Sequence, residues 1–422
     1  MEKVKFDFER VYSRVLGENG LEEKELERIL ERLKEYYLDL VRRHEIGELG
    51  FMKLPYTNYS YIERIAGIMR ERYSQLILVG IGGSSLGAEA VLDALFYRVN
   101  GNYLVFDNVD PMKFDKLVRK IDFKNACIVV ISKSGSTLET VANFLLLYGL
   151  FKNVLKEDIR DRIVIITDPE KGPLRKLGVE LGIKCFDIPR NVGGRFSVLS
   201  PVGIFPFYFV GLDVGSLLAG ARKAIPDPNC IDIHHPAFML SAVYYSLYTR
   251  GKSMNVYMTY MECMEKFVDW FRQLWAESLG KDGKGQTPVK AIGTVDQHSQ
   301  IQLYNDGPKD KVVTFIVPDG CSFVDFTIGE TLIGDFDYLR NKSQGEILRA
   351  SYEGTRDAMT ERGIPNITIT LSKIDEEVFG YLFMVYEIAV SLSGYLLGVN
   401  PFDQPGVERG KEITRRKLMV KE

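Results

Sequence analysis

The sequence predicts an α/β protein of two tandem α/β/α sandwich domains with parallel sheets, preceded by an N-terminal helical segment. Short runs rich in β-branched residues alternate with helical patterns, and runs that are apolar throughout are typical of parallel strands covered on both faces. The alternation occurs twice, on either side of a Pro- and Asp-rich stretch at residues 225–235. A length of 422 residues suits two large domains. The expected limits are 1–60 for the helical segment, 61–225 and 226–399 for the two domains, and 400–422 for a C-terminal loop and tail.

The expected elements follow one another regularly along the chain. Residues 21–46 predict a helix, because Leu26, Ile29 and Leu33 recur at three- and four-residue spacing with Glu and Lys on the other faces. This first segment reads as entirely helical. The strands expected in the first domain are Gln75–Val79, Tyr103–Phe106, Cys127–Ile131, Arg162–Ile166 and Lys184–Ile188. Those expected in the second domain are Met254–Tyr260, Val289–Gly293, Val312–Val317 and Ile367–Leu371.

Composition and charge exclude several classes of protein. The chain has 54 Lys and Arg against 57 Asp and Glu, a net charge of −3, so it offers no basic field for nucleic acid or an anionic membrane. The five cysteines include no CxxC pair, which argues against a disulfide framework or zinc ribbon and fits a reducing cytoplasm. The N-terminus lacks the apolar core of a secretory signal. His44 begins the sequence HEIGE, without the second histidine of a zinc helix, and no metal site is expected.

One segment, Val378–Val399, is long and apolar enough to be weighed as a membrane span. Its only charged residue is Glu387, and no other segment is expected to share this character. A lone span in the middle of a soluble chain is the less favoured interpretation. A helix buried between other layers is expected instead.

Two glycine- and hydroxyl-rich segments follow strands, where ligands of parallel sheets bind. The first, Gly80–Gly87, fits neither a dinucleotide fingerprint, because Ser85 occupies the third glycine position, nor a P-loop, because Ala88 stands in place of lysine. A tight turn into a helix is the alternative for it. The second, Ser132–Thr140, has four hydroxyls within six residues at a helix start, which favours phosphate binding. A capping box formed by Ser136 and Glu139 explains only part of this pattern.

Four further positions carry groups suited to acid–base chemistry. Arg195 follows two glycines, so its guanidinium can be aimed at a developing oxyanion. Glu277 lies near the end of a helix and is a candidate general base. His298 follows a strand and is a candidate acid–base group. Lys411 ends a Gly- and Pro-rich segment that begins at Asn400 and could close over a site. Singly, each is also compatible with a surface or loop residue.

Together these residues resemble the glucose-6-phosphate isomerase (phosphoglucose isomerase) family, and the resemblance runs from about residue 75 to residue 411. It rests on six separated motifs in the family's order, while the N-terminal helical part matches loosely. The motifs are Gly82–Gly87, Ser132–Thr140, Gly193–Ser197, Trp275–Lys281, Gly293–His298 and Asp403–Lys411. Ala88 departs from the pattern, since many relatives have Pro there.

The resemblance implies reversible isomerisation of glucose 6-phosphate and fructose 6-phosphate through a cis-enediolate, in glycolysis and gluconeogenesis, without a cofactor. It also implies that the two α/β/α sandwich domains are of the sugar-isomerase type, and that the protein is a homodimer in which the neighbouring subunit supplies the histidine. Glu277 resembles the base that moves the proton between C2 and C1, and Arg195 the cation beside the enediolate oxygen. His298 and Lys411 resemble the pair that opens the sugar ring. The remaining matches are Ser132, Ser134 and Thr137 in the phosphate cradle with Lys133 alongside, and Gly83, Ser84, Glu139 and Gln404 around the sugar.

Three other functions are compatible with part of the pattern. A non-catalytic sugar-phosphate sensor would need the serine cradle but not the four acid–base and charged residues, all of which are present. A nicotinamide dehydrogenase is opposed by Ser85. An isomerase that also accepts mannose 6-phosphate stays open, because the stereochemistry at C2 is read by the shape of the pocket.

Overall fold

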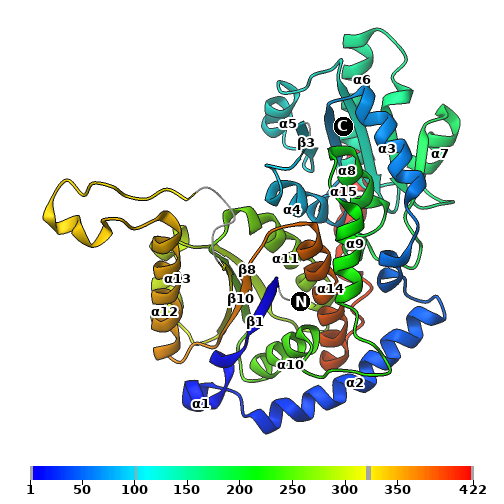
Figure 1. Cartoon of the computed structure of the whole chain (residues 1–422). Coiled ribbons are helices and arrows are strands. Elements are labelled where there is room, and N and C mark those ends of the chain that lie inside the picture. The colour runs from blue at the N-terminus through cyan, green and yellow to red at the C-terminus, as the bar shows by residue number, and fades with distance from the viewer. Residues whose placement is uncertain (1–2, 100–101, 320–324, 420–422) are drawn as a thin grey trace.

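Two five-stranded sheets, one in each lobe of the molecule, form the framework of the computed structural model (Figure 1). The structure describes residues 3–99, 102–319 and 325–419. The first sheet is parallel throughout and has the strand order β3-β2-β4-β5-β6. Its strands are β2 (Gln75–Val79), β3 (Asn102–Phe106), β4 (Ala126–Ser132), β5 (Ile163–Thr167) and β6 (Lys184–Asp187).

Helices cover both faces of the first sheet, which is why its central strands β2, β4 and β5 are buried at every position. Leu76 and Leu78 of β2 belong to the core cluster that contains α3 (Ser60–Arg72) and α8 (Pro201–Val210). Ile77 and Val79 point to the opposite face and belong to the cluster that contains α6 (Leu138–Leu155). Alternate residues of one strand therefore enter two different cores, as the two-residue period of a strand requires.

The second sheet has the order β1-β10-β9-β7-β8 and is parallel except for β1. Its strands are β1 (Val4–Asp7), β7 (Met254–Thr259), β8 (Thr287–Ile292), β9 (Lys311–Pro318) and β10 (Asn366–Leu371). The antiparallel strand β1 corrects the expectation that the N-terminal segment is entirely helical. Its four residues pair with the edge of β10, with Val4 opposite Leu371. Val4 and Phe6 alternate with the exposed Lys5 and Asp7, but this two-residue period lasts for only four residues.

The apolar helix α14 (Glu376–Leu397) lies inside the protein, as predicted for this segment. Buried residues make up 89% of its apolar window, and it packs against α2 (Glu23–Glu45), α9 (Val214–Lys223), α10 (Pro236–Thr249) and α11 (Glu265–Leu279). The crossing with α9 is close, because a Cβ on Gly380 would lie 1.8 Å from the carbonyl oxygen of Leu217. Glycine at that position lets the two helix backbones touch.

A second helix, α6, is also long and apolar enough to meet the criteria for a span, which corrects the expectation of a single such segment. Only 28% of its window is buried, and Leu145, Leu146 and Val154 are each more than half exposed. The remaining helices are α1 (Ser13–Leu16), α4 (Leu86–Ala94), α5 (Pro111–Val118), α7 (Pro173–Leu181), α12 (Ile301–Asp306), α13 (Gln344–Glu361) and α15 (Glu408–Met419).

Residues 325–343, which we call the arm, extend away from the second lobe (Figure 1, yellow). The arm exposes several large apolar side chains, including Phe326 at 66%, Leu332 at 90% and Tyr338 at 73%. Four of the five cysteines are free thiols, and Cys321 lies outside the described residues. All nine strands expected from the sequence are present, with ends within two residues of the expected ones. The expected domain limits stay a prediction.

Candidate active site

The strand order of the first sheet places two polar loops at its switch point. The connection from β2 leads to β3 on one side, whereas β4 lies on the other side of β2. In open parallel sheets, ligands bind outside the carboxyl ends of the strands where the order reverses. The loop after β2 contains Gly82–Ser84, and the loop after β4 contains residues 133–137.

The loop after β4 presents its hydroxyls at the start of α6. The Oγ of Ser132 and the Oγ1 of Thr137 are hydrogen-bonded at 2.8 Å, and Ser134 Oγ accepts a hydrogen bond from the backbone N–H of Ser136 at 3.2 Å. The capping box expected from Ser136 and Glu139 is wrong: the helix begins at Leu138, its N-cap is Thr137, and no side chain caps it. The first amides of α6 are therefore not taken up by a side-chain cap, which suits an anion.

The loop after β2 touches the segment that carries Arg195. A Cβ on Gly83 would lie 2.3 Å from the carbonyl oxygen of Gly194, so only glycine allows this approach. Arg195 belongs to a short 3₁₀ turn, Gly194–Phe196. Ser197 Oγ donates to the Gly194 carbonyl at 2.6 Å, which closes this turn.

Arg195 is buried, and four hydrogen bonds fix its guanidinium. Its Nε donates to Ser278 Oγ at 2.6 Å, and its Nη1 donates to Gln404 Oε1 at 2.9 Å. Its Nη2 donates to the carbonyl oxygens of Pro401 and, at 2.9 Å, Asp403. Burial lowers the pKa of Arg195 from its usual value, against the opposing effect of nearby carboxylates. The guanidinium is therefore held in a fixed orientation, as is required of a group that stabilises a negative charge developing during a reaction.

Glu277 lies beside this guanidinium, near the end of α11. Its Oε2 is 3.8 Å from Arg195 Nη1, and its side chain is 24% exposed. Gln273, one helical turn earlier, donates from Nε2 to the same oxygen at 3.1 Å. The sequence analysis missed Gln273. Its spacing of four residues from Glu277 on one helix is the signal that could have found it.

The segment after α14 completes this side of the site. Gln404 contacts Arg195, and Asp403 Oδ1 accepts from Lys281 Nζ at 2.9 Å. Lys411 lies in the first turn of α15, where its Nζ is 2.8 Å from Glu408 Oε1. Both of these α15 side chains are mostly exposed.

These loops surround one cavity of about 1140 Å³. Ten of the twelve residues predicted for the site line it, namely Gly83, Ser84, Lys133, Ser134, Thr137, Glu139, Arg195, Glu277, Gln404 and Lys411. Ser132 is 1% exposed and reaches the cavity only through its hydrogen bond with Thr137. His298 lies elsewhere, exposed in the turn after β8 (Val295–His298).

Cations and carboxylates are interspersed around the cavity. Lys133 donates to the carbonyl of Arg190 at 3.2 Å, and burial lowers its pKa despite the opposing effect of Asp168. The pKa of Asp168 is lowered, chiefly by a hydrogen bond from the backbone N–H of Glu170. Further cations on the lining are Lys171, Arg415 and Arg416. A cavity with these groups can hold an anion at one end and a polar, uncharged body at the other.

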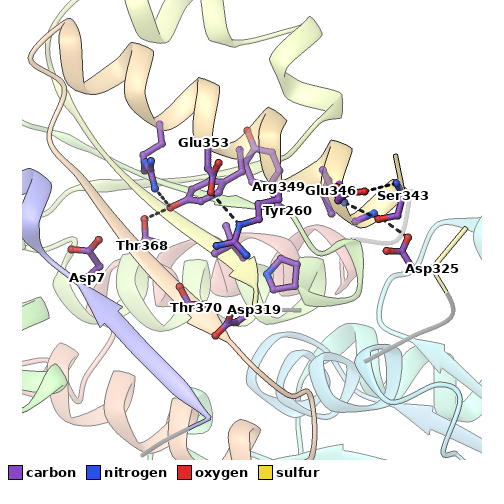
Figure 2. Close-up of a pocket in the computed structure, with 16 residues that line it drawn as sticks. Asp7, Tyr260, Asp319, Asp325, Ser343, Glu346, Arg349, Glu353, Thr368 and Thr370 are labelled. Carbon is purple, nitrogen blue, oxygen red and sulfur yellow. Dashed lines mark hydrogen bonds and ion pairs between the residues drawn. The ribbon is translucent and has the colours of Figure 1, made fainter. Parts of the chain in front are cut away.

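A second cavity, of about 340 Å³, lies at the carboxyl ends of β9 and β10 and beside α13 (Figure 2). None of the predicted site residues lines it. Figure 2 shows that five labelled carboxylates lie around this cavity, which is unfavourable for a phosphate. They are Asp7, Asp319, Asp325, Glu346 and Glu353. Among the residues that the structure describes, no group of three or more His, Cys, Asp or Glu is placed to hold a metal ion.

Comparison with known proteins identifies the family. A sequence model described as phosphoglucose isomerase matches residues 63–318 and 341–420. The chain belongs to the phosphoglucose isomerase family. The glucose-6-phosphate isomerase of Rubrobacter xylanophilus is 39% identical to this chain over an alignment of 437 residues. The alignment covers 99% of this chain and 98% of the relative. The probable glucose-6-phosphate isomerase of Methanococcus maripaludis is 37% identical and covers 99% and 94%.

Two solved structures share the fold of this chain. The crystal structure of a hypothetical protein from Thermus thermophilus is 34% identical, with a TM-score of 0.84 over 99% of this chain and all of that one. A glucose-6-phosphate isomerase from Chlamydia trachomatis shares the fold, with a TM-score of 0.81 at 20% identity over 99% of this chain and 89% of that one.

Proposed function

We propose that this protein interconverts glucose 6-phosphate and fructose 6-phosphate, a step of glycolysis and gluconeogenesis, at the 1140 Å³ cavity. The observation that carries the proposal is the contact between a carboxylate, Glu277, and a buried guanidinium, Arg195, 3.8 Å apart. Both line a cavity whose other wall is the hydroxyl-rich start of α6. Membership of the phosphoglucose isomerase family supports the same reaction.

The carboxylate and the guanidinium suit proton transfer between adjacent carbons. Glu277 takes the proton from C2 of the open-chain aldose, the electron pair enters the C1–C2 bond, and the carbonyl oxygen at C1 becomes negative. The hydroxyl proton of O2 passes to O1, Glu277 returns its proton to C1 as the C1–C2 electron pair forms the new C–H bond, and C2–O2 becomes the carbonyl of the ketose. Arg195 lowers the energy of the negative cis-enediolate between the two steps, since it is charged, buried and already oriented. No resident cofactor is proposed for these steps.

The start of α6 suits the phosphate group. Ser134 and Thr137 supply hydroxyls, Ser132 acts through its hydrogen bond with Thr137, and the positive end of α6 and Lys133 favour a negative charge. Phosphate held there orients the sugar without touching the reacting carbons. Gly83, Ser84, Glu139 and Gln404 are proposed to line the sugar.

Ring opening needs a proton donor and an acceptor, which we assign to Lys411 and His298. Because His298 lies outside the cavity of its own subunit, a second copy has to supply it. Two exposed apolar surfaces support a homodimer: the arm, and the outer face of α6 with Leu145, Leu146 and Val154. We place the enzyme in the cytoplasm, in keeping with its free thiols.

Turnover in heavy water tests the proposed base. Fructose 6-phosphate converted in D₂O should yield glucose 6-phosphate labelled at C2, because the proton on Glu277 exchanges with solvent before it returns. Glu277→Gln should bind fructose 6-phosphate within about threefold of the wild-type affinity and lose at least about 10³-fold in kcat. Near-normal turnover in Glu277→Gln would remove the base, and absence of turnover in the wild type would remove the proposed function.

Mixed dimers test the shared site. Glu277→Gln and His298→Ala, each inactive alone, are unfolded together, refolded as a mixture, and assayed. If the partner supplies His298, each mixed dimer regains one site with both groups intact, so about a quarter of the wild-type activity should return. Activity no higher than that of the separate variants would show that Glu277 and His298 act within one chain. Normal activity of His298→Ala alone would show that His298 does not act.

A further inference from the structure

Lys281 joins the end of α11 to the segment that follows α14. Its Nζ donates to Asp403 Oδ1 at 2.9 Å, to the carbonyl oxygen of Ser278 at 3.0 Å, and to the carbonyl oxygen of Asn400. These three acceptors use all three N–H groups of an ammonium. The side chain is 10% exposed, and the hydrogen bond from Lys281 lowers the pKa of Asp403. The contact is therefore a charged, largely buried tie between two elements far apart in sequence.

Arg195 holds the same segment, residues 400–404, from the other side. Its Nη1 contacts the side chain of Gln404, and its Nη2 contacts the carbonyls of Pro401 and Asp403. Asp403 thus joins both cations, with its carboxylate toward Lys281 and its carbonyl toward Arg195. Three of the four hydrogen bonds of Arg195 end on this segment, so any movement of the segment carries the guanidinium with it.

Lys281 itself is outside the cavity that contains Arg195 and Glu277. It lines a neighbouring cleft of about 420 Å³, which lies against Glu277 and Gln404 from the other direction. A role through contact with substrate in the 1140 Å³ cavity is therefore excluded by its place. The geometry leaves an indirect role, in which Lys281 acts through the residues that it holds in place.

We propose that Lys281 is a positioning residue of the isomerase: it fixes residues 400–404 so that Arg195 stays aimed at the enediolate oxygen beside Glu277. The inference rests on the proposed function and adds to it a residue that touches neither substrate nor reacting atoms. Loss of Lys281 should slow the reaction because it displaces Arg195, and a displacement of about 1 Å in a catalytic group can lower the rate by about 100-fold.

The segment keeps its fold without Lys281, because other contacts anchor it. Pro401 packs directly over Gly394 of α14, where a Cβ would lie 2.8 Å from the proline ring. The ring of Phe402 lies 5.5 Å from that of Phe196, and the guanidinium of Arg43 lies 5.1 Å from the Phe402 ring. Loss of Lys281 should therefore shift the segment rather than unfold it.

The test compares Lys281→Met with Lys284→Met. Lys284 is a matched control, because it lies three residues away and also donates to a backbone carbonyl, that of Leu397 at 2.8 Å. Unlike Lys281, its side chain makes no hydrogen bond or ion pair with the described residues 400–404. Lys281→Met should lower kcat by about 30- to 100-fold with KM within about threefold, because the phosphate cradle is on the other wall of the cavity. Lys284→Met should stay within about twofold in both.

A kinetic isotope effect separates positioning from general loss of structure. With glucose 6-phosphate deuterated at C2, Lys281→Met should show a larger isotope effect on kcat than the wild type, since proton transfer becomes the slower step. Asp403→Asn weakens the same tie and should move both readouts in the same direction, by about three- to tenfold in kcat. It also serves if Lys281→Met fails to fold.

The result that overturns the inference is a kcat within about threefold of the wild type in Lys281→Met, or a fall in kcat with an unchanged isotope effect. A fall of equal size in Lys284→Met would do the same. These outcomes leave the proposed function standing as long as the wild type turns over and Glu277→Gln does not. Failure of the wild type to isomerise fructose 6-phosphate would instead defeat the function itself.

Discussion

Replacing Arg195 by lysine keeps a positive charge beside Glu277 but removes the planar fork that holds it there. The guanidinium makes hydrogen bonds to acceptors on two sides, Ser278 Oγ on one and the 400–404 segment on the other. The compact ammonium of lysine cannot reach acceptors on both sides at once, so we expect about two of the four hydrogen bonds to be lost. At about 1.5 kcal/mol for each contact of a buried, charged group, the free energy of unfolding should fall by about 3 kcal/mol.

The same change should slow the reaction. A misplaced cation loses most of its stabilisation of the enediolate, and loss of one preset electrostatic contact costs about 3 kcal/mol, or about 10²-fold in kcat. Urea unfolding measures the first effect, and steady-state kinetics with fructose 6-phosphate measure the second. Arg119→Lys is the control, because Arg119 pairs with Asp115 while 76% exposed and should be close to neutral. An Arg195→Lys variant within threefold of the wild-type kcat would refute the reasoning.

Two further predictions concern the phosphate cradle and the N-terminal helix. Ser134→Ala combined with Thr137→Ala should raise KM by about tenfold or more and lower kcat less, because the cradle binds substrate and transition state alike; an unchanged KM would count against it. Burial lowers the pKa of His44 from 6.5 to about 4, and its Nδ1–H donates to the carbonyl of Leu40 at 2.8 Å. Because the unfolded chain takes up the proton first, His44 should cost the protein about 3 kcal/mol of stability between pH 6.5 and pH 4. His44→Leu should remove this fall in the free energy of unfolding, measured by urea titration at each pH between 6.5 and 4. If the variant's free energy of unfolding falls with pH as steeply as that of the wild type, the lowered pKa of His44 is contradicted.

The inner parallel strands were predictable because they are buried at nearly every position. A short, mostly apolar run such as Gln75–Val79, bounded by turn residues, is best interpreted as a buried strand. The predicted strand ends therefore lie within two residues of the observed ones. Strand β1 was missed for the opposite reason. It is four residues long and pairs on one edge only, so the alternation of Val4 and Phe6 with Lys5 and Asp7 is too brief to mark a strand without its pairing to β10.

The site was predictable where a residue's neighbours in sequence are also its neighbours in space. The hydroxyls of residues 132–137 come together because they follow one strand end. The expected capping box of Ser136 and Glu139 was wrong because α6 has Thr137 as its N-cap, one residue later than the pattern placed it. The hydroxyl of Ser136 instead donates to Ser134 Oγ at 3.2 Å. The four hydrogen bonds of Arg195 link residues more than 80 positions apart, and no local pattern reports such pairs.

Strand β8 is an outer strand of the second sheet and has β7 as its neighbour. A bare strand edge is a template on which other chains can polymerise into fibrils. Here Pro288 offers no N–H to an incoming chain, and Lys290 carries a charge held by Glu265 at 2.6 Å and Asp269 at 3.1 Å. The edge of β8, the strand that leads directly to His298, is thus protected against pairing with another chain. A concentrated solution of this enzyme should resist the formation of amyloid-like fibrils through this edge.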